Sequence, residues 1–427
     1  MASRSFTGLA PLENRDFRLL FTGSAVGHTM MPLQFLTQIF WVQETAPENV
    51  WLLLVSLIGA SRGVGALTFG LYGGALADRF DRRKLLMVSQ ALLLITTVLI
   101  AALMHFSDGE ILGFALFYLL TFVSAGMFSI DAPTRMAITP DILGRDLTPA
   151  GMSLNQAAIQ LSMPLAILAS GFVIDEFGYS GAYFLSALGH LAVLGALVPM
   201  KYRKSTSTGP AGTYGFGRII RDIREGLGYA RHEPVVLWTI VLMFALMGIG
   251  FPATSNLGPT WITTVVGVEI RWVGLVAMSW GIGAFASAVV MMRYASFERR
   301  GILIAAGAVT FSVAFVIFVA DHSVINAVIG NLGLGVGMTM ASLSSTILVQ
   351  HRVPNEIRGR IMSLFQLNMG FAQLMTLPVA ALAQWLTLQV LFPWMALTLL
   401  VIVLSILASQ RQIWHARILL NQPPQAG

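Results

Sequence analysis

The chain has 427 residues, of which 56% are hydrophobic and only 11% are charged, and its mean hydropathy is +0.75. Soluble domains carry about 25% charged residues, so this composition excludes an ordinary soluble protein and predicts an all-α membrane protein. Cysteine is absent, which excludes disulfides and thiolate metal sites, and we expect no metal centre.

The predicted spans begin directly after the N-terminal stretch MASRSFTGLAPLENRDFRLL. The first apolar run has no small-residue cleavage pattern behind it, so we expect it to remain in the protein. With about 20 apolar residues for each helical crossing, the chain contains twelve predicted transmembrane helices, over 17–43, 50–76, 84–105, 111–137, 149–174, 180–200, 234–263, 272–294, 301–320, 324–350, 358–386 and 390–409.

The connections between these spans alternate in charge. One side holds most of the 26 Lys and Arg residues, whereas the connections on the other side are acidic or neutral and contain a single cation, Arg271. By the positive-inside rule the cationic side faces the cytoplasm, which places both termini there. The net charge of +6 therefore reports membrane topology, and we expect no nucleic-acid partner.

The longest connection divides the spans into two sets of six. Its first part, KYRKSTSTGPAGTYG, is typical of a flexible linker, and its second part, FGRIIRDIREGLGYAR, predicts an amphipathic helix on the inner membrane surface. We interpret this helix as a linker without a regulatory role. The predicted organisation is an N-terminal six-helix bundle over 1–200, a cytoplasmic linker over 201–233, a C-terminal six-helix bundle over 234–409 and a cytoplasmic tail over 410–427.

Two short segments recur in the second half of the chain. FDRRKLL (80–86) returns as FERRGIL (297–303), and MSLNQ (152–156) returns as MSLFQ (362–366), in the same order and with nearly the same offset. This repetition indicates a duplicated bundle. Parallel repeats related by an axis along the membrane normal are a transporter architecture, with the substrate site near the membrane midplane.

A charged loop, GGALADRFDRR (73–83), follows the second span. It resembles the motif Gly-x-x-x-Asp-Arg-x-Gly-Arg-Arg/Lys of the major facilitator superfamily, with Asp81 in the place of the second Gly. The segments DAPTR (131–135) and VPNEIRGRIMSL (353–364) look like the branch of that superfamily that includes enterobactin exporters and macrolide efflux proteins. The resemblance covers the whole chain in topology and implies the major facilitator fold, whose two bundles work by alternating access.

The charged loop is interpreted as part of a cytoplasmic gate. Resemblance implies that Asp78 meets the start of the eleventh span, near 358–362, when the cytoplasmic side is shut. Asp131 and Arg135 share one face of the fourth span, and the predicted end of that span lies about 9 Å from Asp131, within reach of Arg82 or Arg83. Two alternatives stay open, namely that Asp131 carries a transported proton and that it forms a purely structural pair with Arg135. The predicted gate residues are Gly74, Asp78, Arg79, Arg82, Arg83, Asp131 and Arg135.

Three further polar residues lie at membrane depth. Arg62 is about 21 Å from the inner end of its span, and it either offers its guanidinium to an anionic substrate or pairs with backbone carbonyls, a Gln or Glu44. His28 lies near the middle of the first span, where it either carries a proton or forms a neutral hydrogen bond between helices. His190 is equally deep, but resemblance places its span at the periphery, so we do not expect it to take part.

The remaining candidates line the cavity that the resemblance implies. The segment FPATSNLGP (251–259) interrupts the seventh span, while LGLGVGM (332–338) lies inside an apolar span and predicts close helix packing rather than a nucleotide loop. No Walker motif is present, so we expect a proton gradient as the energy source and no cofactor. The candidate substrate or proton residues are His28, Gln38, Arg62, Asn256, Trp261 and Asn331.

These observations predict a secondary active transporter rather than an enzyme. The leading hypothesis is proton-coupled efflux of a small amphipathic compound, either a drug or a siderophore-like metabolite. Uptake by symport is a second hypothesis, and a lipid flippase or a non-transporting membrane assembly factor is a third. We expect a monomer in the bacterial cytoplasmic (inner) membrane, with the small-molecule substrate and membrane lipids as its partners.

Overall fold

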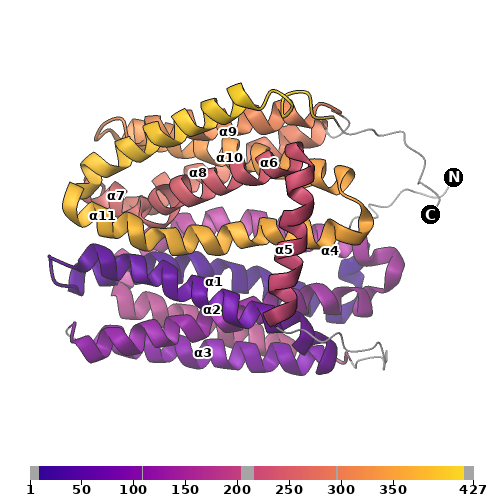
Figure 1. Ribbon diagram of the computed structural model, residues 1–427. Coiled ribbons are helices and arrows are strands. Elements are labelled where there is room, and N and C mark those ends of the chain that lie inside the picture. The colour runs from indigo at the N-terminus through magenta and orange to yellow at the C-terminus, as the bar shows by residue number, and fades with distance from the viewer. Residues whose placement is uncertain (1–8, 108, 203–215, 295–296, 418–427) are drawn as a thin grey trace. The chain divides into compact units, whose positions relative to one another are not determined.

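The structure, a computed structural model, describes residues 9–107, 109–202, 216–294 and 297–417. Every regular element in these ranges is a helix, which confirms the all-α prediction (Figure 1). In chain order the elements are η1 (Ala10–Glu13), α1 (Arg15–Thr45), α2 (Trp51–Arg79), α3 (Arg82–Phe106), α4 (Ile111–Leu197), α5 (Phe216–His232), α6 (Pro234–Ala245), η2 (Leu246–Gly250), η3 (Pro252–Asn256), α7 (Gly258–Thr264), α8 (Ile270–Arg293), α9 (Arg300–Phe318), α10 (Val324–Arg352) and α11 (Asn355–Ser409).

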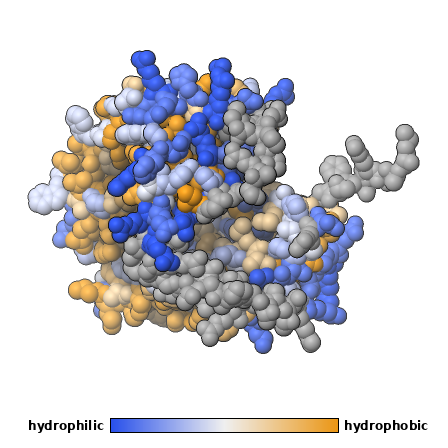
Figure 2. All heavy atoms as spheres, turned by 45° about the vertical axis from the view of Figure 1, so that its right-hand side comes forward, coloured by the Kyte–Doolittle hydropathy of each residue, from blue (hydrophilic) through white to orange (hydrophobic). Residues whose placement is uncertain are grey.

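Nine helices in the described part of the chain are long and apolar enough to cross a membrane. Large apolar side chains on their outer faces, such as Ile95, Val289 and Val401, are exposed, as expected where a helix faces lipid. Figure 2 shows hydrophilic residues gathered toward the middle and right of the face in view and hydrophobic residues gathered along its left side. The protein is therefore a multi-pass membrane protein, while the count of twelve spans and the cytoplasmic termini stay predictions.

Two helices are too long for a single crossing. The 87 residues of α4 would reach about 130 Å, against about 30 Å for the hydrocarbon core. Its helical path is interrupted at Gly144 (φ 71°, ψ 175°) and Gly178 (φ 66°, ψ −179°), and that of α11 is interrupted at Thr387 (φ 59°, ψ 156°). All three breaks lie between predicted spans. A Cβ at either glycine would meet nothing within 4 Å, so glycine is needed there for its backbone conformation rather than for space.

Side-chain caps explain where several helices begin. Asn14 accepts from the backbone N–H groups of Asp16 and Phe17 at the start of α1. Asp81 Oδ1 accepts from Lys84 N at 2.9 Å at the start of α3. Asp81, which stands where the loop motif has Gly, is thus the N-cap of α3, a position that favours Asp over Gly.

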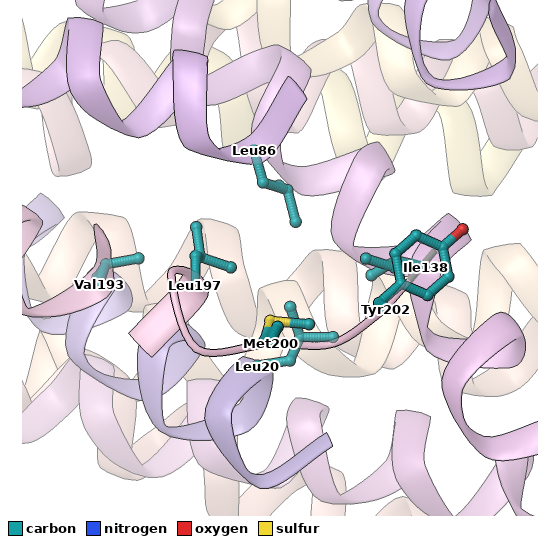
Figure 3. Packing of buried hydrophobic residues seen from close by; sticks show 7 residues of the cluster. All are labelled: Leu20, Leu86, Ile138, Val193, Leu197, Met200 and Tyr202. Carbon is teal, nitrogen blue, oxygen red and sulfur yellow. The ribbon is translucent and has the colours of Figure 1, made fainter. Parts of the chain in front are cut away.

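Contacts divide the chain into two compact units. Unit 1 comprises Met1–Tyr214 with Ile270–Gly274, and unit 2 comprises Gly215–Glu269 with Leu275–Gly427. In unit 1 a buried cluster joins α1, α3 and α4 to the residues after α4 (Figure 3), and its members are Leu20, Leu86, Ile138, Val193, Leu197, Met200 and Tyr202. The predicted limits of the bundles, the linker and the tail stay predictions.

Unit 2 contains three features that the sequence predicts. Its α5 occupies the segment interpreted as amphipathic, and Glu225 of α5 forms an ion pair with Arg360 of α11. The seventh predicted span is interrupted, since α6 passes into the π-helical turns η2 and η3 before α7 begins. A Cβ on Gly337 of α10 would lie 2.7 Å from the carbonyl oxygen of Gly307 in α9, which confirms that the LGLGVGM segment packs closely against a neighbouring helix.

Candidate functional site

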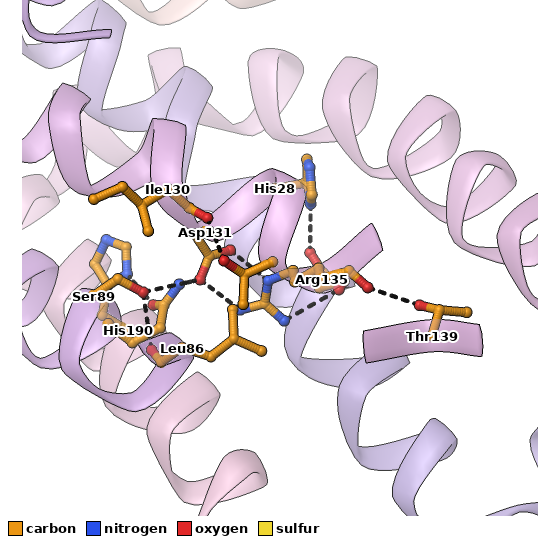
Figure 4. A network of polar contacts seen from close by, with 11 residues as sticks. His28, Leu86, Ser89, Ile130, Asp131, Arg135, Thr139 and His190 are labelled. Carbon is orange, nitrogen blue, oxygen red and sulfur yellow. Dashed lines mark hydrogen bonds and ion pairs between the residues drawn. The ribbon is translucent and has the colours of Figure 1, made fainter. Parts of the chain in front are cut away.

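A buried ion pair lies within unit 1. Asp131 and Arg135 are each 5% exposed, and Arg135 Nε lies 2.5 Å from Asp131 Oδ2 (Figure 4). The spacing of four residues puts both side chains on one face of α4, as the sequence predicts. A buried ion pair costs desolvation free energy unless further hydrogen bonds satisfy both groups.

Side chains of α1 and α3 supply those hydrogen bonds. Gln90 Nε2 donates to Asp131 Oδ1 at 2.9 Å, and Ser89 Oγ donates to the same oxygen at 3.4 Å. On the other side of the pair, Arg135 Nη1 donates to Ser24 Oγ at 3.2 Å. The pair therefore ties three helices of unit 1 together through one carboxylate and one guanidinium.

The network extends to His190, which the sequence analysis set aside. His190 Nδ1 lies 3.1 Å from Gln90 Oε1, and His190 Nε2 lies 3.1 Å from Gln34 Nε2. Because Gln90 uses its amide N–H on Asp131, its oxygen must accept from His190 Nδ1–H, which leaves Nε2 to accept from Gln34. His190 is thus buried, neutral and connected to Asp131 through one amide. These contacts connect His190 to the network, contrary to the peripheral position that the resemblance implied, while its absence from the transport mechanism stays a prediction.

His28 lies one helical turn from this network. Its Nδ1 donates to the carbonyl oxygen of Ser24 at 2.7 Å, and its ring meets the edge of Phe128 at a centroid distance of 6.3 Å. Within the described part of the chain the second ring nitrogen has no partner. His28 therefore lies near the pair without belonging to it, and its role as a substrate or proton residue stays a prediction.

The arginines of the charged loop have partners other than Asp131. Arg82 Nη1 lies 2.6 Å from Asp141 Oδ2 and donates to the Ala137 carbonyl at 2.8 Å, while Arg83 donates to the carbonyls of Leu197 and Val198. The predicted reach from Asp131 to Arg82 or Arg83 was therefore wrong. Helix α4 continues to Gly144 rather than ending near 137, so Asp131 lies about 20 Å from its end.

Asp141 joins the loop to the residues after α4. The Tyr202 hydroxyl donates to Asp141 Oδ2 at 2.5 Å. Burial and this hydrogen bond raise the pKa of Tyr202 above its ordinary value, so the hydroxyl keeps its proton and remains a donor. The side chains of 71–79, including Gly74, Asp78 and Arg79, lie outside the described residues, and their gate role stays a prediction.

Arg62 has no carboxylate partner among the described residues. Its guanidinium lies 5.1 Å from the ring centroid of Phe35, and its Nη1 is buried without a hydrogen-bond partner. Glu44, the alternative partner, accepts instead from the Tyr179 hydroxyl. Pairing with Glu44 was thus a wrong alternative. An unpaired cation at membrane depth is a functional-site candidate.

Gln38, also in unit 1, has a buried amide oxygen without a hydrogen-bond partner among the described residues. Its Nε2 donates to the Tyr183 hydroxyl at 2.7 Å and to Thr121 Oγ1 at 3.2 Å, while its Oε1 is buried without a partner. Tyr183 is also an electrostatic neighbour of Arg62. Unit 1 therefore places an unused cationic donor and an unused amide acceptor around one tyrosine, an arrangement suited to a ligand with both an anionic group and a hydroxyl.

The three candidates in unit 2 are held by neighbouring helices. Asn256 Nδ2 donates to Gln373 Oε1 at 2.8 Å and to Thr376 Oγ1 at 2.6 Å. Asn331 Nδ2 donates to backbone carbonyls of α8, and Trp261 stacks on an aromatic ring of α11 with its centroid 5.3 Å away. These contacts satisfy the amide nitrogens of Asn256 and Asn331, whereas the buried indole N–H of Trp261 has no hydrogen-bond partner among the described residues. The predicted ligand roles of all three stay predictions.

Known proteins resemble this chain over most of its length. The Staphyloferrin A transporter of Staphylococcus aureus is 18% identical over 357 residues, which are 83% of this chain and 85% of that protein. A mutant of the nucleoside transporter NupG superposes with a TM-score of 0.76 at 11% identity, covering 93% of this chain and 100% of that one. A mutant of the peptide transporter POT in complex with sulfate superposes with a TM-score of 0.72 at 15% identity, covering 94% of this chain and 95% of that one.

The family comparison agrees with the motif in the charged loop. The model of the Major Facilitator Superfamily matches residues 19–377, which is most of the chain. The similarity to solved transporters at 11% and 15% identity shows the fold. The chain belongs to the major facilitator superfamily of membrane transporters.

Proposed function

We propose that this chain exports a small amphipathic compound with an anionic group, such as a siderophore-like metabolite, in exchange for protons. In this proposal twelve spans form two six-helix bundles that alternate access across the bacterial inner membrane, with both termini in the cytoplasm. The observation that carries the proposal is Arg62, whose buried Nη1 has no hydrogen-bond partner. An unpaired arginine inside a membrane costs several kcal/mol, and an anionic substrate group offsets that cost.

The surroundings of Arg62 narrow the substrate class. The face of Phe35 covers one side of the guanidinium, while Gln38 Oε1 offers an acceptor beside the Tyr183 hydroxyl. A carboxylate or catecholate satisfies the cation, and a neighbouring hydroxyl satisfies the amide. The similarity to a protein named Staphyloferrin A transporter supports a siderophore-like compound.

Proton coupling is assigned to Asp131. Its carboxylate is buried, lies away from Arg82 and Arg83, and is held by Arg135, Gln90 and Ser89. Its distance from the charged loop argues against membership of the gate, and of the two remaining alternatives, a proton carrier and a purely structural pair, the proposal takes the proton carrier. Protonation of Asp131 removes one charge of the pair and frees the Arg135 guanidinium, so a proton entering here changes the contacts between α1, α3 and α4.

A thermal-shift panel on the purified protein tests the substrate site. Anionic siderophores, lipophilic cations, sugars and lysolipids are compared on wild type, Arg62→Gln and the matched control Arg271→Gln, whose side chain is 45% exposed. We expect stabilisation by an anionic siderophore that is lost in Arg62→Gln and kept in Arg271→Gln. Stabilisation by lipophilic cations that is unchanged in Arg62→Gln would contradict the proposal and favour multidrug efflux.

A further inference from the structure

The segment that follows α11 forms a groove on the surface of unit 2. The groove has a volume of about 490 Å³ and lies between α9, the end of α11 and the segment 410–417. Its lining residues are Val309, Leu404, Leu407, Ala408, Arg411, Trp414 and His415. This volume is in the range of small-molecule and cofactor sites.

The segment that builds the groove is anchored to unit 2. Ile413 and Ala416 are buried, and Gly301 N donates to the Ala416 carbonyl at 3.1 Å. The Trp414 indole N–H donates to the Leu407 carbonyl at 3.0 Å, which satisfies one of the last free carbonyls of α11. Trp414 is therefore fixed against the helix and lines the groove, with 39% of the residue exposed.

The groove has one apolar end and one cationic end. Leu404, Leu407 and Val309 form the part that follows the apolar helices, whereas Arg411 and His415 lie beyond the end of α11. His415 Nδ1 donates to the Arg411 carbonyl at 2.9 Å, so its Nε2 remains for a ligand. Within the described chain the Arg411 guanidinium has no ion-pair partner, and the sequence contains no Asp or Glu after Glu356.

We propose that this groove binds an anionic phospholipid of the leaflet at which the C-terminal segment emerges, with the phosphate at Arg411 and His415 and an acyl chain along Leu404 and Val309. The cationic end of the groove matches the phosphate of a phospholipid, and its apolar end matches the acyl chain. Tryptophan and arginine are the side chains typical of the membrane interface, and anionic lipids attract cations placed there. The inference is independent of the proposed substrate, since every lining residue belongs to unit 2.

Native mass spectrometry of the full-length protein tests the groove. The protein is released from vesicles with equal amounts of phosphatidylglycerol and phosphatidylcholine, and retained lipid is measured for wild type, Arg411→Gln and His415→Gln. Arg417→Gln is the matched control, because Arg417 is an exposed cation of the same segment outside the lining. We expect retention of phosphatidylglycerol to fall about fivefold in Arg411→Gln, because one cation near an anionic lipid surface contributes about 1 kcal/mol. Retention should be unchanged in Arg417→Gln.

Three results would overturn the proposal. They are equal retention of both lipids by wild type, an equal fall in Arg417→Gln, and stabilisation of the protein by inorganic phosphate as strong as that by phosphatidylglycerol. A second measurement locates the lipid without any charge change. Brominated phosphatidylglycerol should quench wild-type fluorescence more than that of Trp414→Phe, and equal fractional quenching would place the lipid elsewhere.

Discussion

The Asp131–Arg135 pair makes a quantitative prediction about stability. Removing one partner of a buried ion pair costs about 3–5 kcal/mol, because the remaining charge is left uncompensated. Arg135→Met leaves the Asp131 carboxylate with Gln90 and Ser89 as donors, so its cost should lie near the lower limit of that range. Asp131→Leu leaves the Arg135 guanidinium with only Ser24 Oγ, so its cost should lie near the upper limit.

The double variant measures the free energy of the interaction between Asp131 and Arg135 apart from that of their other contacts. Asp131→Leu with Arg135→Met removes both charges and leaves only neutral partners such as Gln90 unsatisfied, at about 1–3 kcal/mol for each buried group. We therefore expect it to be more stable than Asp131→Leu alone, with a coupling free energy of about 2 kcal/mol or more. Unfolding of the detergent-purified variants by heat and by denaturant measures these differences. Additive costs of the two single substitutions would refute the reasoning.

The other predictions concern backbone conformation, capping and packing, and each is measured as a change in the unfolding free energy of the purified protein. Gly144→Ala should cost about 1–3 kcal/mol because of its positive φ, whereas Gly195→Ala, with nothing within 4 Å of the added Cβ, should be neutral or stabilising. Thr387→Gly should stabilise by about 1 kcal/mol, since Thr387 has a φ of 59°; destabilisation would contradict this. Asp81→Ala should cost about 1 kcal/mol through loss of the α3 cap, and an unchanged stability would show that the cap contributes nothing. Gly337→Ala should cost about 1–3 kcal/mol through its clash with α9, and full stability would mean that the helices move apart freely.

Features with a local signal in the sequence were predictable. The spacing of four residues placed Asp131 and Arg135 on one helix face, and a lone cation in an apolar run identified Arg62 as unusual. Helix breaks at Gly144 and Gly178 fell between runs of about 20 apolar residues, a length set by the bilayer. These inferences needed only the periodicity of one helix or the length of one span.

Contacts between distant segments were not predictable in the same way. Gln90 and Asp131 are separated by 41 residues and His190 and Gln90 by 100, so their meeting depends on how three helices pack and rotate. Polar residues at membrane depth are a usable signal, because an unsatisfied polar group in lipid is costly. Applying that rule to Gln34 and Gln90 as it was applied to Arg62, and keeping His190 despite the position that the resemblance implied, would have identified candidates for the network.

The Arg82–Asp141 ion pair shows how an error in a predicted helix end leads to an error in a predicted contact. Ending the fourth helix near 137 put Asp131 beside the charged loop, whereas the helix continues to Gly144 and brings Asp141 there. Pro140 in the final turn of this segment suggests an earlier end, but the surrounding residues keep helical geometry. The error in one helix end thus moved a predicted contact by ten residues.

Substrate flux in proteoliposomes is the most direct test of anion–proton exchange. An imposed pH gradient drives an anionic siderophore across the membrane in wild type, Arg62→Gln, Asp131→Asn and the control Arg271→Gln. The account predicts flux that requires the gradient, that is lost in Arg62→Gln together with substrate binding, and that is uncoupled from pH in Asp131→Asn while binding is kept. Flux that persists without a gradient in wild type, or that is unchanged in Arg62→Gln, would contradict it.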